Sequence, residues 1–91
     1  MPALSVAPNP IAGPTTIRFD LAAPARASLR LLDTGGRTVQ RILEGDFPAE
    51  DNRLTWEPTR ARPGGAPAGV YFLLLEAGDQ GRRVQRVVVT R

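Results

Sequence analysis

The residue types that most often carry chemistry in small proteins are largely missing from this chain. It contains no histidine, no cysteine and no lysine, and all twelve of its basic residues are arginine. Serine and threonine are present, but no imidazole, thiolate or amine is available to activate them as nucleophiles. The absence of cysteine also excludes disulfides and thiolate metal sites. We therefore predict that the protein is not an enzyme and binds no cofactor.

Carboxylates are the remaining chemical candidates. Two acids held in a cleft could hydrolyse a glycosidic bond, but the acids of this chain fall at strand ends or on outward faces, where solvated side chains are the default. They include Asp20, Asp33, Glu57 and Glu76. Segment 45–51 clusters oxygen donors of the kind that Ca²⁺ prefers, but without the spacing of a ligand loop. We therefore expect no catalytic residue and no metal ligand.

The charge of the chain is basic but scattered. The formal net charge is +3 and the sequence pI is about 11. Nucleic-acid-binding proteins usually gather such charge on one face, with aromatic side chains between the basic ones. Here the arginines alternate with nine acids and only Arg82 and Arg83 are adjacent, so we predict no nucleic-acid binding. Arg18 with Asp20, or Arg30 with a neighbouring acid, is expected to pair across strands.

The longest apolar run, residues 70–75, is the segment around which the chain is organised. It lies between Gly69 and Gly78, a length typical of a strand and far too short to cross a bilayer, so we predict no membrane insertion. One face collects Tyr71, Leu73, Leu75 and Ala77, and the other collects Val70, Phe72 and Leu74. A strand that is apolar on both faces is normally central. Its second face therefore suggests a partner surface, for the preceding domain or for a second copy forming a dimer.

Six further segments have the pattern of short strands. They are residues 4–6, 15–21, 27–32, 37–44, 52–57 and 82–91. Turn residues separate them, with prolines around Asn9, a hairpin signal at 33–36, a polar loop at 45–51, a crossover at 58–69 and a turn at 79–81. Seven strands without a helical period predict an all-β fold, a seven-stranded antiparallel immunoglobulin-like β-sandwich formed by residues 1–91 as a single domain. Tyr71 is then either the tyrosine corner of such a fold or a core aromatic.

Short motifs along the chain resemble one known family when they are taken in order. Pro8-Asn9-Pro10-Ile11, followed by Thr15-Thr16-Ile17-Arg18-Phe19, is similar to the opening "PNPF…TTIRF" of that family. Later matches are Leu29-Arg30-Leu31-Leu32-Asp33 with Gly35-Gly36-Arg37-Thr38-Val39, Leu54-Thr55-Trp56, Ala68-Gly69-Val70-Tyr71-Phe72 and Arg86-Val87-Val88-Val89-Thr90-Arg91. Over nearly its whole length the chain resembles the C-terminal sorting domains of the type IX (Por) secretion system.

The chain departs from the family pattern at three positions. Ile11 stands where phenylalanine is usual, Leu32 where tyrosine is usual, and Arg86 where lysine is common. The immunoglobulin-like domain of flagellar hook-capping proteins shares the same signature. Three alternatives therefore stay open, namely a structural module of a hook-capping protein, an accessory domain of a multidomain secreted hydrolase, or a carbohydrate-binding sandwich. The last would need a row of exposed aromatics, and the chain has only one Trp, one Tyr and three Phe.

The resemblance implies the C-terminal module of a larger exported protein that carries a signal peptide and an N-terminal cargo domain. The outer-membrane secretion translocon would recognise the folded module in the periplasm. A sortase-like peptidase would then remove it and leave the cargo at the cell surface or outside the cell. For partner recognition the resemblance favours Gly36, Arg37, Arg86, Val87, Val89 and Arg91. Plain core packing accounts for Val87 and Val89 equally well.

Overall fold

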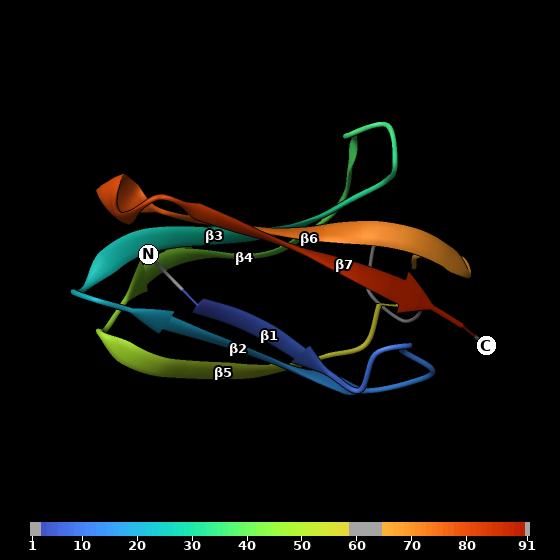
Figure 1. The fold of residues 1–91 in the computed structure, drawn as a ribbon, viewed down its shortest axis with the longest axis horizontal. Helices are drawn as coiled ribbons and strands as arrows, with labels where there is room; N and C mark the ends of the chain where they lie inside the picture. The colour runs from blue at the N-terminus through green and yellow to red at the C-terminus, as the bar shows by residue number, and fades with distance from the viewer. Residues whose placement is uncertain (1–2, 59–64, 91) are drawn as a thin grey trace.

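The computed structural model describes residues 3–58 and 65–90. Strands are the main regular element of this part of the chain (Figure 1). They are β1 (Ala3–Ala7), β2 (Thr15–Leu21), β3 (Ala25–Leu32), β4 (Thr38–Phe47), β5 (Glu50–Trp56), β6 (Gly69–Ala77) and β7 (Arg82–Val89), with one 3₁₀ turn at Gly78–Gln80. No helix in the described residues is long and apolar enough to cross a membrane.

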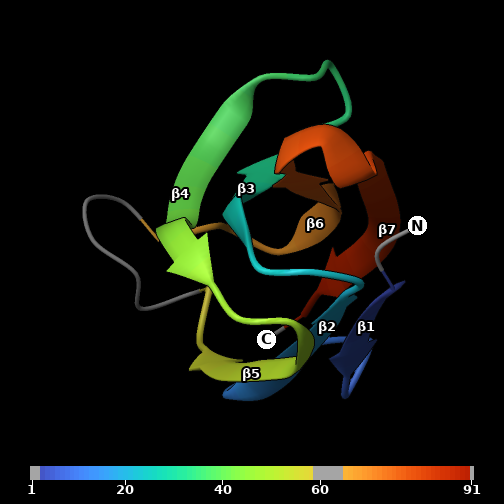
Figure 2. The ribbon, with the colours of Figure 1, turned by 90° about the vertical axis from the view of Figure 1, so that its left-hand side faces the viewer.

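The strands form two antiparallel sheets that face each other, as Figure 2 shows from one end. One sheet has the strand order β1-β2-β5 and the other the order β4-β3-β6-β7. This arrangement confirms the predicted all-β fold, a seven-stranded antiparallel sandwich of immunoglobulin-like type. The apolar run 70–75 lies in β6, which is an interior strand between β3 and β7, as its two apolar faces predicted.

The alternation of side chains along each strand determines which residues form the core. The side chains of β2 alternate strictly between buried and exposed, beginning with buried Thr15, because every second residue of a strand faces the opposite sheet. The fully buried core comes from both sheets and includes Ile17, Phe19, Leu29, Leu31, Leu73, Leu75, Val87 and Val89. The radius of gyration is 12.4 Å, close to the ~12 Å expected for one domain of this length.

The prediction of a polar loop at 45–51 is wrong. β4 continues through Gly45 and Asp46 to Phe47, in register with the start of β3, and β5 begins at Glu50. The turn itself is only Pro48 and Ala49. Glycine and aspartate are poor strand formers, but Phe47 outweighs them because its ring packs edge-to-face on Phe19, with ring centroids 5.5 Å apart.

The register of β4 is irregular, which explains why the sequence pattern left it open. The pairing of β3 with β4 shifts between Leu29 and Arg30 and again between Leu31 and Leu32. Such bulges reset which side chains face the core. Val39, Ile42 and Leu43 are therefore all partly buried against the core, although they do not share one simple alternation.

Tyr71 forms the tyrosine corner. Its hydroxyl donates a 2.6 Å hydrogen bond to the carbonyl of Pro67, four residues upstream, which is the geometry of that motif in immunoglobulin-like folds. The ring is also buried in the core, and burial raises the pKa of its phenol. The predicted crossover at 58–69 lies partly outside the described residues.

Candidate partner-recognition site

Gly36 and Arg37 belong to the hairpin between β3 and β4, which Asp33 organises. One carboxylate oxygen, Oδ1 of Asp33, accepts hydrogen bonds from the backbone N–H groups of Gly35 and Arg37, both at 2.9 Å. The carbonyl of Asp33 accepts the N–H of Gly36 at 3.0 Å. Gly36 has a φ of +86°, a conformation that favours glycine. The predicted hairpin is confirmed, and it presents the exposed Arg37 at its tip.

Arg86 lies on β7 where an N-terminal segment is clamped to the outer edge of that strand. The side-chain amide of Asn9 donates to the carbonyl of Arg86 at 3.1 Å and accepts the N–H of Val88 at 3.0 Å. An asparagine amide thus copies one unit of strand pairing, offering one donor and one acceptor side by side. The Arg86 side chain is exposed, because even-numbered residues of β7 face away from the core.

Ile11 extends the same clamp by two residues. Its N–H donates to the carbonyl of Val88 at 2.6 Å, and its carbonyl accepts the N–H of Thr90 at 2.7 Å. This forms a parallel bridge between Ile11 and Val89, while the Ile11 side chain is buried in the core. The clamp, defined here as Asn9 together with Ile11, therefore joins the first resemblance motif to the last one.

The remaining predicted recognition residues differ in accessibility. Val87 and Val89 are 0% and 1% exposed, so a partner that binds the folded domain cannot reach their side chains. The structure thus places both valines in the core, in agreement with the alternative that they serve core packing rather than partner recognition. Arg91 lies outside the described residues.

The structure brings the hairpin and the clamped end of β7 to the same end of one sheet without putting them in contact. Leu32 lies opposite Phe72, and Phe72 lies opposite Arg86. β3 and β7 therefore run in the same direction, with β6 between them, toward the Arg37 turn and toward Val89. Figure 1 shows the hairpin and the final residues of β7 toward this end of the sheet.

Exposed ion pairs lie across strands on both outer faces. Arg18 on β2 pairs with Asp51 on β5 at 3.5 Å rather than with Asp20, its predicted partner. Residues two apart on one strand share a face but do not lie opposite each other, and Asp51 is also held by Arg53 at 2.9 Å. The hydrogen bond from Arg53, aided by the charges of both arginines, lowers the pKa of the Asp51 carboxyl.

Arg30 pairs with an acid of the neighbouring strand, as predicted. Its guanidinium contacts Glu76 on β6 at 2.9 Å and donates to the Thr38 hydroxyl at 3.1 Å. These pairs are solvent-exposed or half-buried, so solvent screening leaves them only a small contribution to stability.

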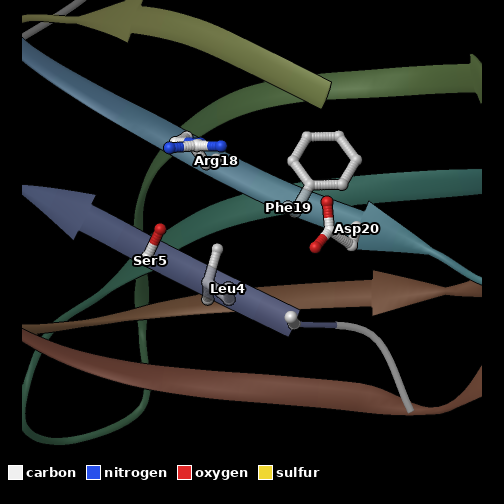
Figure 3. Close-up of a pocket in the computed structure, with 6 residues that line it drawn as sticks. Leu4, Ser5, Arg18, Phe19 and Asp20 are labelled. Atoms are coloured by element: carbon white, nitrogen blue, oxygen red, sulfur yellow. The ribbon is translucent and has the colours of Figure 1, made fainter. Parts of the chain in front are cut away.

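Two open hollows lie on these surfaces. One of about 250 Å³ lies over β1 and β2, where Ser5 is opposite Arg18 and Ala3 is opposite Asp20 (Figure 3). The other, of about 320 Å³, lies over β3, β4 and β6 beside Arg30 and Arg41. Neither contains a buried polar side chain aimed into it. Within the described residues no three acids gather to hold a metal ion.

The structurally important polar residues that sequence reasoning missed are three side-chain amides. Asn9 was interpreted only as part of a turn, but it pairs with β7. Gln40 is buried and links Trp56 to Pro58. Gln80 accepts the N–H of Ala22 and donates to the carbonyl of Ala23, both at 2.8 Å. An amide offers both a donor and an acceptor, so a lone Asn between prolines or a Gln in an apolar strand was the available signal.

Comparison with known proteins leaves the family unassigned. No protein-family model matches the chain, and no curated protein is significantly similar to it.

Proposed function

We propose that the domain is a C-terminal sorting and attachment module, which directs an exported cargo protein through the type IX outer-membrane translocon to the cell surface. In this proposal the domain is the substrate of the translocon and of a sortase-like peptidase. The cargo precedes it, and the parent protein carries a signal peptide. The domain itself does no chemistry, which agrees with a chain that lacks histidine, cysteine and lysine.

The observation that carries the proposal is the contact between the two terminal motifs of the resemblance. Asn9 of the Pro8-Asn9-Pro10-Ile11 motif hydrogen-bonds to Arg86 and Val88 of the closing motif. Motifs 77 residues apart in the sequence therefore form one surface in the folded domain. This supports recognition of a folded module, because neither segment alone would hold that shape.

The exposed members of the predicted set are the side chains that a translocon could bind. Arg86 and Arg37 present guanidinium groups at the same end of the four-stranded sheet, and neither forms an ion pair within the described residues. Val87 and Val89 contribute by holding β7 in the core. We therefore assign recognition to Arg37 and Arg86, and a supporting role to the two valines.

A secretion assay with point variants tests this proposal. Residues 1–91 are fused behind a signal peptide and a fluorescent reporter in a bacterium that has the type IX machinery. We expect reporter at the cell surface or in the medium, and periplasmic retention of the double variant Arg37→Gln, Arg86→Gln. Arg26→Gln is the control, because Arg26 is also exposed but lies near the start of β3, at the opposite end of the sheet.

Point variants are needed because deleting the last strand would also remove buried Val87 and Val89 and unfold the domain. Circular dichroism of each purified variant verifies that it is folded. If the unsubstituted domain is folded but its reporter remains in the periplasm, the sorting function is wrong. A structural sandwich, as in flagellar hook-capping proteins, then becomes the leading interpretation.

A further inference from the structure

The first half of β7 presents an open strand edge. β7 is the outermost strand of its sheet, and β6 is the one strand with which it pairs; the Ile11 bridge contacts only its far end, at Val89. Val88 uses both its N–H and its C=O on the clamp, so the even-numbered residues of β7 direct their backbone groups away from β6. The N–H and C=O of Arg82 and Val84 and the N–H of Arg86 therefore point outward. No other described residue hydrogen-bonds to them.

This open edge, residues 82–86, already shows its capacity to pair. The same strand accepts an extended segment two residues further along, where Ile11 bonds to Val88. The edge is also accessible, because each of its residues except the half-buried Gln85 is exposed. Val84, at its centre, is 58% exposed, the largest exposure of any large hydrophobic side chain in the described chain. A strand added here would extend an existing ladder and cover an exposed valine.

The charges along the open edge specify what kind of strand can bind. Arg82, Arg83 and Arg86 form no ion pair within the described residues, and β7 contains no acid. An extended segment with carboxylates opposite these arginines would gain cross-strand charge pairs.

A second copy of this chain fits the open edge poorly. Two-fold antiparallel pairing about Val84 would place Arg82 of one copy opposite Arg86 of the other. Like charges directly opposite each other destabilise a strand pair. Arginines at an edge therefore discourage self-association, while leaving the edge open to a strand of opposite charge.

We propose that the open edge binds an extended acidic segment of another protein by strand addition. Antiparallel to β7, the segment places carboxylates opposite Arg86, Arg83 and Arg82 and a β-branched apolar residue opposite Val84. This binding site shares the Arg86 side chain with the surface proposed for sorting, but its backbone edge is separate from that surface, and the proposal does not depend on the sorting function.

A synthetic peptide tests the proposal directly. The probe is acetyl-Ser-Glu-Thr-Ile-Glu-Glu-Ser-amide, and the control replaces each Glu by Lys. Both are titrated into the ¹⁵N-labelled full 91-residue chain. We expect the acidic peptide to shift the amide resonances of Arg82, Val84 and Arg86. Near saturation it should slow hydrogen exchange of the Val84 amide by about tenfold, because that N–H becomes bonded.

Two substitutions at Val84 separate backbone pairing from simple charge attraction. Val84→Pro removes the outward N–H without removing a bond to β6, and proline is tolerated on such an edge. We expect it to weaken peptide binding at least about tenfold. Val84→Thr keeps the N–H and the β-branched shape, so it should bind the peptide like the unsubstituted chain. The double variant Arg82→Gln, Arg83→Gln keeps the backbone N–H groups of the edge. It should weaken peptide binding and make the remaining affinity less dependent on salt concentration.

Several results would overturn the proposal. Equal binding of the acidic and lysine peptides would show that charge does not select the partner, and unchanged binding by a folded Val84→Pro variant would show that the edge does not pair. Concentration-dependent sedimentation that Val84→Pro abolishes would identify a second copy as the occupant. Binding to phosphatidylglycerol vesicles that shifts the same amides, with no response to the acidic peptide, would identify an anionic membrane surface.

Discussion

The buried amide of Gln40 provides the sharpest test of how this core is held together. Gln40 is 7% exposed and lies on β4 between two polar groups. Its Oε1 accepts the indole N–H of Trp56 at 3.1 Å, and its Nε2 donates to the carbonyl of Pro58 at 2.7 Å. We predict that Gln40→Met, which keeps the side-chain length but removes both functions, destabilises the domain more than any surface substitution.

The expected loss of stability depends on which hydrogen bonds Pro58 and Trp56 keep after the substitution. The Pro58 carbonyl retains a second hydrogen bond, from the N–H of Ala66 at 2.9 Å. Losing the hydrogen bond from Gln40 therefore costs about 1 kcal/mol. The Trp56 indole N–H is left buried without an acceptor, which costs about 1–3 kcal/mol. We therefore expect the free energy of unfolding to fall by about 2–4 kcal/mol. For a domain of this size that lowers the Tm by roughly 10–30 °C.

A double-mutant cycle with Trp56→Phe isolates the indole bond. Without the indole N–H, Gln40→Met no longer strands a donor, so its effect should be smaller by about 1–2 kcal/mol in that background. Unfolding in urea is best followed by far-UV circular dichroism. Trp56 is the only tryptophan, so Trp56→Phe removes the fluorescence signal that would otherwise report unfolding. Gln85→Met is the control, because the Gln85 amide is only half-buried and donates to the carbonyl of its neighbour Arg86. Equal effects of Gln40→Met in both backgrounds, or a loss below about 0.5 kcal/mol, would refute the reasoning.

Three further predictions concern the tyrosine corner, the alkaline limit of stability and the clamp. Tyr71→Phe removes the bond to the Pro67 carbonyl and should lower the free energy of unfolding by about 1–1.5 kcal/mol in urea melts. Burial raises the pKa of Tyr71, so its contribution is complete below the unfolded value of about 10 and is lost as pH rises through the folded value. The urea midpoint should therefore stay nearly flat from about pH 6 to 9, because the chain has no His, Cys or Lys, and its alkaline fall should be smaller in Tyr71→Phe. Asn9→Ala removes the acceptor of the Val88 amide and should speed hydrogen exchange of that amide by about tenfold; an unchanged rate would show that the clamp is held by Ile11 alone.

The parts of the fold that were predictable from sequence are those where local pattern and tertiary environment agree. β2 alternates strictly between buried and exposed side chains, and β6 carries apolar side chains on both faces, because each is an interior strand paired on both sides. Tyr71 could be placed near a corner because it follows a long connection and begins a strand. The turn residues at 33–36 located the hairpin, since a glycine at position 36 supplies a backbone conformation that other residues resist.

The parts that sequence missed depend on residues distant along the chain. Phe47 continues β4 only because Phe19 of another strand is there to receive it. Asn9 and Gln40 are polar residues whose roles are set by partners 16 or more positions away, such as Arg86 and Trp56. Period-two patterning cannot detect an amide that completes a core or a sheet edge, because it scores only whether a residue is polar.

The outer edge of β7 is divided between two uses, and Arg86 lies where they meet. Its carbonyl belongs to the clamped half, through Asn9, while its N–H belongs to the open half. Substituting its side chain alters the sorting surface but leaves both backbone groups in place. Val84→Pro blocks the open half and leaves the Arg86 and Arg37 side chains untouched. If Val84→Pro abolishes acidic-peptide binding but not secretion, the edge serves a partner other than the translocon. Loss of both activities in that folded variant would show that the translocon itself adds a strand here.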